Sequence, residues 1–422
     1  MHTIRLSAAL GAGAALLMFS SALFAQTLAT GDQRPNVKEP TYPMVCKVLT
    51  ADFNTSQRAE DITSAEDDTA RIQDAFDSCQ GTDKSIVLTA TNTENAFFTN
   101  KLDLKAGETL VVGPGVTLFG DNSYAKESEL IYAKGANIGI MGPGTIDGRG
   151  DLLSSIGKPR LIEAKDLSNF VVYNITLKNA CKMHLYMEDG SGVTVWKLRV
   201  LTPANTKNTD GVDIDSLNDV TVAHSSINAG DDGIVVKTNS APASDITVKD
   251  NQLYGTHGLS IGSQTMYGVT NVLWENNIVF GTDKFGIVST DNNGINIKSD
   301  YACGGEVKQI TYRNTQLIGV KHLLIFNTYY GSCSGFEGYP YYHDIVVDGV
   351  TAADSQSGAY SEFEGYNADY PLGLYLAHVH LDVTNQTKSQ YANVGLDNSN
   401  IIPAGTGVTT FYFNVPPPVG LQ

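Results

Sequence analysis

Short apolar runs recur along the chain with nearly constant spacing, and this periodicity limits the folds that the chain can adopt. The first five runs begin 23, 27, 26 and 26 residues apart, and two later runs follow after 38 and 35 residues. Their first residues are Asn169, Gly192, Asp219, Asp245, Asn271, Gln309 and Asp344. Each unit alternates β-branched residues and is punctuated by Asn, Asp and Gly, which is typical of short strands joined by turns. A period of about 20 to 50 residues indicates stacked units that cannot bury their apolar faces alone. The sequence therefore predicts an all-β parallel β-helix rather than a β-sandwich, whose turn signals recur every ~8–12 residues.

The N-terminus has the features of an export signal. Arg5 precedes an apolar run of small residues from position 6 to 24, and Ala25 before Gln26 fits a cleavage point. Because no second apolar span follows, we prefer this reading to a transmembrane helix. The expected organisation is a signal peptide over residues 1–25, a flexible solvated leader over 26–40 and a single β-helix domain over 41–422. The protein is then secreted, or periplasmic in a Gram-negative cell.

One helix is expected, over residues 67–79, with acidic residues at its start and Ile72, Ala75 and Phe76 on one face. It would cover the N-terminal end of the β-helix, where strand edges are otherwise exposed.

Five cysteines in an exported chain indicate disulfides with one cysteine left over. Cys46 and Cys79 flank the helix, and Cys303 and Cys333 bracket a loop-rich section. Cys181 is the odd one, and we expect it to be buried as a small apolar residue. No Cys/His spacing indicates zinc, so neither a metal nor a cofactor is expected.

The formal net charge of −17, without a basic stripe, argues against nucleic-acid binding. It leaves the substrate open, because a site can be locally basic on an acidic protein.

One acidic residue and an acidic pair lie one repeat apart. Asp210 ends the run Asn208-Thr209-Asp210, and Asp231 and Asp232 lie in Gly230-Asp231-Asp232-Gly233. If each repeat is one coil, these carboxylates stack on one face. Burying like charges together drives their pKa values apart and provides an acid and a base in one place.

The competing interpretation of such acids is a ladder of turn residues along the β-helix. We prefer that interpretation for Asp213, Asp215 and Asp219.

Four ordered motifs resemble those of the polygalacturonases of glycoside hydrolase family 28. They are Asn208-Thr209-Asp210, Gly230-Asp231-Asp232, His257-Gly258 within residues 256–263, and Ile297-Lys298 within residues 294–299. The segments 138–150 and 68–70 also look like that family. The resemblance covers roughly residues 60 to 350. It implies a right-handed, single-stranded parallel β-helix that binds a pectic chain in a cleft.

The resemblance also implies hydrolysis with inversion at the anomeric carbon. Asp231 would protonate the glycosidic oxygen, while Asp210 and Asp232 would position and deprotonate the attacking water. An inverting pair stands about 6.5–9.5 Å apart to leave room for water. Carboxylates on adjacent coils, about 4.7–4.9 Å apart per strand plus side-chain reach, are compatible with that separation.

His257, one coil beyond the acids, would hold Asp231 through a hydrogen bond. By the same resemblance Lys298 would offer a point charge to a sugar carboxylate. Asn208 and Asn296 would also contact the substrate, and Tyr330 would contact a sugar face.

Asn296 departs from the family, which has Arg at this position. The change replaces a bidentate clamp for a carboxylate with a neutral amide. Lys284, in the inserted segment 280–292, is one source of the missing charge. The other explanation is a substrate without a uronic acid here, as in rhamnogalacturonan.

The resulting hypothesis is a secreted, cofactor-free and monomeric hydrolase that cleaves α-1,4-galacturonosyl bonds of pectin and binds neither nucleic acid nor membranes. Rhamnogalacturonan hydrolysis and exo attack are alternatives within this class. A pectate lyase would need calcium-binding acids and a strong base such as Arg, and the four motifs contain no Arg. A non-catalytic carbohydrate-binding β-helix would need neither the Asp231-Asp232 pair nor His257.

Overall fold

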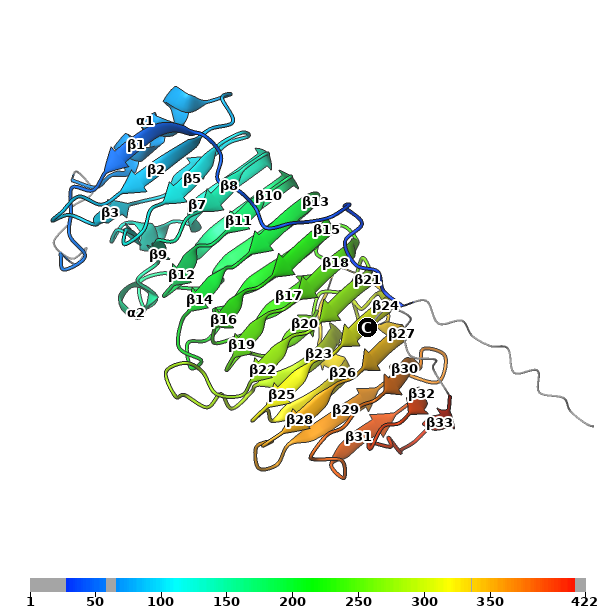
Figure 1. The fold of residues 1–422 in the computed structure, drawn as a ribbon. Coiled ribbons are helices and arrows are strands. Elements are labelled where there is room, and N and C mark those ends of the chain that lie inside the picture. The colour runs from blue at the N-terminus through cyan, green and yellow to red at the C-terminus, as the bar shows by residue number, and fades with distance from the viewer. Residues whose placement is uncertain (1–27, 58–65, 335, 414–422) are drawn as a thin grey trace, which may run out of the picture.

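The chain folds into an elongated parallel β-helix (Figure 1). The structure, a computed structural model, describes residues 28–57, 66–334 and 336–413, so the expected signal peptide lies outside the described residues. All pairings between the named strands are parallel, and they form a 23-stranded and a 10-stranded network. The expected all-β parallel β-helix is confirmed.

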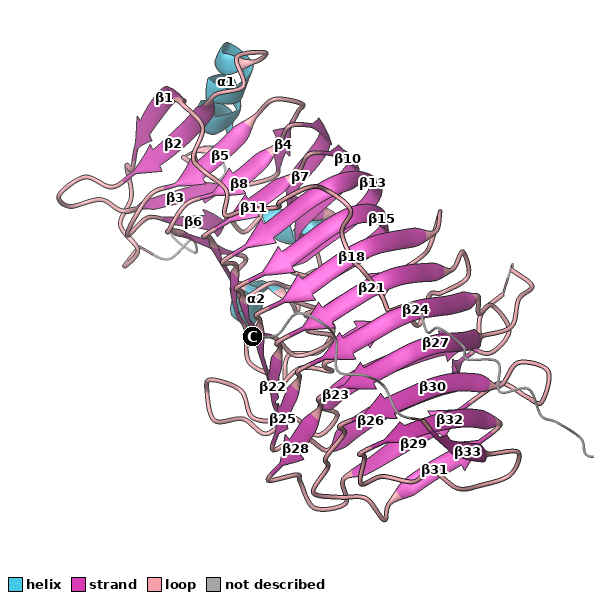
Figure 2. Cartoon of the chain, turned by 45° about the vertical axis from the view of Figure 1, so that its right-hand side comes forward, coloured by secondary structure: helices cyan, strands magenta, loops and turns pink. Residues whose placement is uncertain are grey.

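Three faces run the length of the β-helix (Figure 2). The 10-stranded sheet contains β3 (Ala96–Thr99), β6 (Thr117–Gly120), β9 (Thr145–Asp147), β12 (Thr176–Lys178), β14 (Arg199–Leu201), β16 (Ser226–Asn228), β19 (Gln252–Tyr254), β22 (Ile278–Phe280), β25 (Gln316–Ile318) and β28 (Thr351–Ala353).

The second face, here called the cleft sheet, contains β4 (Leu102–Leu104), β7 (Glu129–Ala136), β10 (Arg160–Ser168), the first halves of β13 (Leu185–Trp196) and β15 (Val212–Ala223), β17 (Ile234–Lys237), β20 (Leu259–Ile261), β23 (Asn293–Asp300), β26 (His322–Gly331), β29 (Tyr360–Glu364) and β31 (Thr387–Gln390).

The third face, here called the outer sheet, contains β1 (Val45–Thr50), β2 (Ser85–Thr89), β5 (Thr109–Val112), β8 (Gly139–Met141), β11 (Val171–Tyr173), the second halves of β13 and β15, β18 (Ala243–Lys249), β21 (Val269–Glu275), β24 (Glu306–Arg313), β27 (Tyr341–Asp348), β30 (Leu372–Ala377), β32 (Ala392–Asp397) and β33 (Thr409–Tyr412).

The predicted repeat corresponds to the outer sheet, one apolar run per coil. Thr194, Thr221 and Thr247 are direct partners on successive coils, as the spacing requires. The first residue of every run has a positive φ, between 52° and 79°. These residues turn the chain into the outer sheet, and Asn and Asp tolerate this conformation better than most residues. Asp219 belongs to this series, as expected.

The core is a set of columns of inward-facing apolar side chains. In one column Val222 and Val248 precede Trp274, which stacks on Tyr312 with ring centroids 5.5 Å apart. All four side chains are fully buried. Burial stabilises each large apolar side chain by about 1.5–3 kcal/mol, so the columns hold the coils in register.

The expected cap is confirmed. Helix α1 (Thr69–Cys79) packs on β1, β2 and β4 at the N-terminal end, and buries Ile72, Ala75 and Phe76. The other helices in the described residues are α2 (Gly150–Leu153) and the 3-10 helix η2 (Tyr124–Lys126). Within the described part of the chain, no helix is long and apolar enough to cross a membrane.

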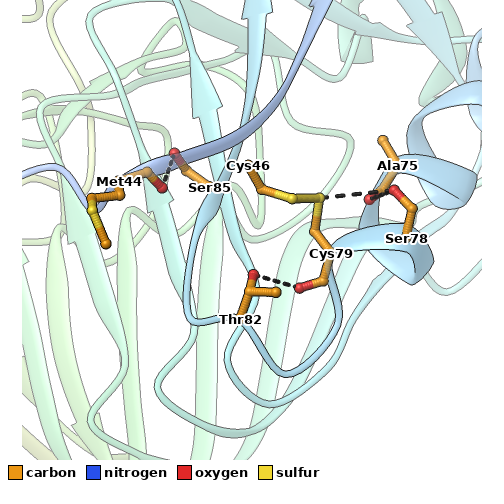
Figure 3. Close-up of a disulfide and its surroundings, with 7 residues drawn as sticks. All are labelled: Met44, Cys46, Ala75, Ser78, Cys79, Thr82 and Ser85. Carbon is orange, nitrogen blue, oxygen red and sulfur yellow. Dashed lines mark hydrogen bonds between the residues drawn. A yellow bond between two sulfur atoms is a disulfide. The ribbon is translucent and has the colours of Figure 1, made fainter.

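Two disulfides form. Cys46 of β1 is bonded to Cys79 at the end of α1, which ties the cap to the first coil (Figure 3). Cys303 is bonded to Cys333, and they join the loops that follow β23 and β26. Cys181 is free and buried, as expected.

The expectation of a solvated leader is wrong for residues 28–39. This segment crosses the outer sheet from β24 towards the first coils (Figure 1). The Asn271 side chain accepts hydrogen bonds from the Thr30 and Gly31 amides, and Arg34 donates to the Val193 carbonyl. The polar groups of this segment form hydrogen bonds with outward-facing Thr and Asn side chains of the outer sheet instead of with water.

Candidate active site

The motif acids meet at the edge of the cleft sheet, on loops stacked by backbone hydrogen bonds. Asp210 precedes β15, and Asp231 and Asp232 precede β17. The Gly211 amide donates to the Asp232 carbonyl at 2.9 Å, and the His257 amide donates to the Asp231 carbonyl at 2.8 Å. A Cβ at position 211 would lie 2.4 Å from the carbonyl oxygen of Gly233, so only glycine permits this approach. The stacked loops bring the predicted acids together, and His257 with them.

Asp231 is paired with His257. The Nδ1 atom of His257 lies 3.0 Å from Oδ1 of Asp231, which also accepts the Asp232 amide at 2.9 Å. Asn208 reaches the other oxygen with its amide nitrogen at 3.5 Å. Burial alone would raise the pKa of Asp231, but the hydrogen bond and charge of His257 outweigh it and lower the pKa to about 2. In the free protein the proton of this pair therefore resides on His257.

His257 responds in the opposite direction. Burial alone would lower the pKa of His257, but the hydrogen bond and negative charge of Asp231 outweigh it and raise the pKa above the ordinary 6.5. The imidazole therefore keeps its proton to a higher pH than a solvated histidine.

Asp232 is held by Lys298 and Ser260. Lys298 Nζ lies 3.1 and 3.0 Å from the two oxygens of Asp232, and Ser260 donates to the first of them at 2.8 Å. Burial would lower the pKa of Lys298, but Asp232 raises it overall. Lys298 thus stays charged although it is almost completely buried.

Asp210 is held by a lysine that the sequence analysis did not single out. Lys237, the last residue of β17, lies 3.1 Å from Asp210 and 2.5 Å from Asp213. Burial raises the pKa of Asp210, and Lys237 offsets only part of this effect. One lysine cannot neutralise two buried carboxylates. Desolvation and the nearby Asp210 therefore hold the pKa of Asp213 well above its usual range.

The interpretation of Asp213 and Asp215 as turn residues is wrong. Both lie within β15 on the cleft sheet and are completely buried. Asp215 accepts hydrogen bonds from Tyr186 at 2.8 Å and from the Asn239 amide at 2.9 Å. Their alternation with apolar residues places them on the face that carries Lys237, so they support the site.

A cavity of about 330 Å³ opens beside Lys298. His257, Asn296 and Tyr330 line it, and the Tyr330 ring centroid lies 5.0 Å from Lys298 Nζ. Asn296 is buried on β23, with its amide nitrogen 3.5 Å from the Ser260 hydroxyl. The structure thus brings all the predicted contact residues except Asn208 to this cavity, and Asn208 lies beside Asp231.

Lys284 does not replace the missing family arginine. Its ammonium donates to Ser226 at 2.5 Å and lies 4.4 Å from the Tyr254 ring centroid. Both partners belong to the 10-stranded sheet, outside the cavity. The inserted segment packs against that sheet because the Lys284 amide donates to the side chain of Asn228 in β16 at 2.6 Å.

Among the described residues, one group has metal-ligand spacing, namely Asp231, Asp232 and His257, whose candidate ligand atoms lie within 4.8 Å of one another. The His257 ring and the Lys298 ammonium already contact the two carboxylates.

Comparisons with known proteins agree with this geometry. The model of "Glycosyl hydrolases family 28" matches residues 79–400. The chain belongs to this family. It is therefore a glycoside hydrolase.

This family 28 hydrolase has bacterial relatives of similar length. An endo-polygalacturonase of Pectobacterium carotovorum subsp. carotovorum is 32% identical, over 88% of this chain and 94% of the relative. A polygalacturonase of Ralstonia solanacearum is 30% identical, over 87% of this chain and 85% of the relative. The solved polygalacturonase of Erwinia carotovora ssp. carotovora aligns with a TM-score of 0.74 at 31% identity, and covers 86% of this chain and 99% of its own.

Two supporting residues of the family 28 site were missed. Lys237 follows the apolar run 234–236, and the coil register that pairs it with Asp215 would have placed it beside the acids. The Nε2 atom of His184 is hydrogen-bonded to the Thr202 hydroxyl at 2.7 Å, and its Nδ1 atom is hydrogen-bonded to the Asp210 carbonyl at 2.9 Å. Burial lowers the pKa of His184 to about 4, so it is neutral. It fixes the loop of Asp210, and no sequence motif marks it.

Proposed function

We propose that this hydrolase cleaves the α-1,4-galacturonosyl bonds of polygalacturonate with inversion at the anomeric carbon. The observation that carries the proposal is the convergence of Asp210, Asp231 and Asp232 at one edge of the cleft sheet. The relatives named endo-polygalacturonase and polygalacturonase, at about one third identity over most of the chain, support the substrate.

In this mechanism Asp231 delivers the proton that the leaving oxygen needs. The low pKa of Asp231 in the free protein opposes this role, and the His257 pair removes the conflict because it stores one proton. A bound polyuronate excludes water and adds negative charge, and both effects favour the neutral carboxyl. The proton then passes from His257 Nδ1 to Asp231 and on to the glycosidic oxygen as the bond to the anomeric carbon breaks.

Asp210 and Asp232 position the water that attacks the opposite face of the sugar. Both are almost completely buried, and Lys237 and Lys298 stabilise their ionised forms. One of the two carboxylates accepts a proton from the water as its oxygen bonds to the anomeric carbon. The two lysines also limit the repulsion between these acids.

The substrate lies along the cleft sheet and contacts the residues of the cavity. Lys298 faces a sugar carboxylate, Tyr330 contacts a sugar ring, and Asn208 and Asn296 donate hydrogen bonds to substrate oxygens.

Rhamnogalacturonan is a second candidate substrate, because Asn296 replaces an arginine and the carboxyl groups of Asp291 and Glu362 also line the cavity. The part of the lining formed by Asp291 and Glu362 suits a neutral sugar better than a uronate. An exo-acting enzyme would release monomers and would lower viscosity slowly.

We further propose that residues 1–25 are removed on export, that residues 41–422 act as one catalytic domain, and that the protein works as a monomer outside the cytoplasm. N-terminal sequencing of protein from culture fluid or periplasm should begin after Ala25. Sedimentation should give the mass of one chain.

The decisive assay follows polygalacturonate and rhamnogalacturonan in parallel, with reducing ends, viscosity and ultraviolet absorbance of unsaturated products recorded together. Endo hydrolysis of polygalacturonate predicts new reducing ends, an early fall in viscosity and no unsaturated product. Calcium-dependent ultraviolet absorbance would identify a lyase instead. A higher kcat/KM on rhamnogalacturonan than on polygalacturonate would identify rhamnogalacturonan as the substrate. The proposed roles of the catalytic residues would remain.

A further inference from the structure

A wall of tyrosines stands beside the cavity, at the carboxyl ends of the cleft-sheet strands. We call it the tyrosine wall; its members are Tyr301, Tyr329, Tyr339, Tyr341, Tyr366 and Tyr370. They come from β26, from the first residue of β27, and from the connections that lead out of β23, β26 and β29 into the outer sheet. Three coils of the β-helix therefore contribute to one aromatic surface.

The rings contact one another in a continuous series. Tyr366 stacks on Tyr329 at 5.4 Å and on Tyr339 at 5.0 Å between ring centroids. Tyr301 lies 6.4 Å from Tyr329 at one end, and Tyr370 lies 5.8 Å from Tyr339 at the other. These separations are in the range of favourable aromatic pairs.

Covalent and hydrogen bonds hold the wall in place. The Cys303–Cys333 disulfide joins the two connections that follow β23 and β26. Tyr329 donates its hydroxyl to the Tyr366 carbonyl, and the Tyr366 amide donates to the Tyr370 carbonyl at 3.0 Å. A preorganised surface loses little conformational entropy when it binds a ligand.

The wall is open to solvent although it is aromatic. Tyr301, Tyr339 and Tyr370 are 43%, 54% and 37% exposed, and they line a hollow of about 950 Å³. Exposed aromatic patches of this kind mark binding sites in soluble proteins. The hollow is large enough for a ligand of several sugar rings.

The charge of the hollow differs from that of the cavity beside Lys298. Its described lining includes Glu306 and Glu337 and contains no lysine, arginine or histidine. Glu306 contacts Lys308 at 2.5 Å and His343 at 2.9 Å, and neither of these partners lines the hollow. In the cavity, by contrast, Lys298 and His257 lie among the lining residues. A uronate in the hollow would therefore meet carboxylates with no cationic side chain in the lining, while an uncharged sugar can place its C–H face on a tyrosine ring and its hydroxyls on the carboxylates.

The wall begins next to the substrate cavity. Tyr329, whose ring stacks on Tyr366 in the wall, is adjacent in sequence to Tyr330, whose ring lines the cavity beside Lys298. A branch or a neighbouring segment of a polymer bound beside Lys298 can therefore reach the wall.

We propose that the tyrosine wall is a second glycan-binding site of this hydrolase, and that it takes uncharged sugar rings. The pectic source of those rings rests on the proposed function, and two sources share the chemistry: neutral branch sugars and methyl-esterified uronosyl residues. Binding to the wall would hold the enzyme on polymer regions that Lys298 does not attract.

The test measures binding in the Asp231→Asn protein, so that turnover cannot interfere. The probes are a linear neutral galacto-oligosaccharide, a methyl-esterified galacturonate oligomer and its de-esterified form, each titrated by calorimetry. Tyr339→Ala and Tyr370→Ala should each weaken binding of at least one uncharged probe about tenfold. Tyr339→Phe should retain binding, because it keeps the ring. Tyr412→Ala is the control, since Tyr412 is 79% exposed on β33 outside the wall.

The neutral galacto-oligosaccharide tests for neutral branch sugars, and the methyl-esterified oligomer tests for esterified uronosyl residues. The proposal is overturned if neither probe binds, if the alanine variants bind as Tyr412→Ala does, or if the de-esterified oligomer loses as much affinity as the uncharged ones. Thermal unfolding of each variant checks that the fold is intact. Failure of the wild-type protein to hydrolyse polygalacturonate would contradict the proposed function and leave this binding result unaffected.

Discussion

The carboxylate cluster has a sealed half and an open half. In the sealed half, Lys237 lies between Asp210 and Asp213, and the Asp213 side chain has no solvent exposure. In the open half, the side chains of His257 and Asp231 are 24% and 21% exposed. In the sealed half burial disfavours the charged carboxylates and Lys237 compensates for this effect only in part. In the open half exposure permits the exchange of the proton that the reaction needs. The cavity-side pair of Asp232 and Lys298 joins these two environments.

The largest effect should come from the open half. Asp231→Asn should lower kcat about 100- to 10,000-fold with little change in stability, because an amide keeps the shape but cannot donate an acidic proton. The matched control is Asp219→Asn, since Asp219 lies in the turn series where Asn also occurs. Retention of more than about a tenth of wild-type kcat, outside the range of general-acid losses, would remove Asp231 from the role of acid.

The sealed half should respond mainly in stability. Lys237→Met leaves two buried carboxylates without a cation and should lower the free energy of unfolding by about 3–5 kcal/mol. Lys298→Met is the comparison, and should cost less, because Asp232 keeps its hydrogen bond from Ser260. Denaturant unfolding at neutral pH measures both. Equal losses of stability would contradict the distinction between the two halves.

The pH dependence of kcat/KM should reflect both halves. As the pH falls, activity is lost when the base carboxylate is protonated, and the raised pKa of Asp210 places this limb above 3.8. As the pH rises, activity is lost when the His257–Asp231 pair gives up its proton, and the raised pKa of His257 places this limb above 6.5. His257→Gln should move the alkaline limb to lower pH. An unmoved limb would show that another group stores the proton.

The smallest effect concerns the edge of the open half. Asn296→Arg should strengthen binding of polygalacturonate by about 1–3 kcal/mol if a uronate lies beside Lys298, since a forked clamp replaces an amide. The measurement is KM for polygalacturonate and for rhamnogalacturonan with both proteins. If KM for polygalacturonate does not fall, the sugar beside Asn296 is not a uronate.

The sequence predicted what depends on local pattern. The coil register followed from the spacing of the apolar runs, and the meeting of Asp210, Asp231 and His257 followed from that register together with the family motifs. The cap was also expected from its local pattern, and disulfides with one cysteine left over were expected from the number of cysteines, although their pairing was not. These features repeat or carry recognisable residues, so one chain is enough to find them.

The remainder depends on contacts between distant segments. The leader was expected to be solvated, but Thr30 and Arg34 bind coils that lie far along the sequence. Asp213 was interpreted as a turn residue because an acid in an apolar run has no visible partner until Lys237 is placed on the next coil. The tyrosine wall likewise joins three connections that no local pattern links.

The stereochemistry of the first product tests the central claim most directly. Proton NMR should follow the anomeric signal of the new reducing end during the first turnovers of wild-type protein on polygalacturonate, before mutarotation. Attack by water positioned by Asp210 and Asp232, opposite a proton from Asp231, predicts that the β anomer forms first from an α-linked substrate. If the α anomer forms first, a covalent intermediate on one of these carboxylates replaces the proposed mechanism.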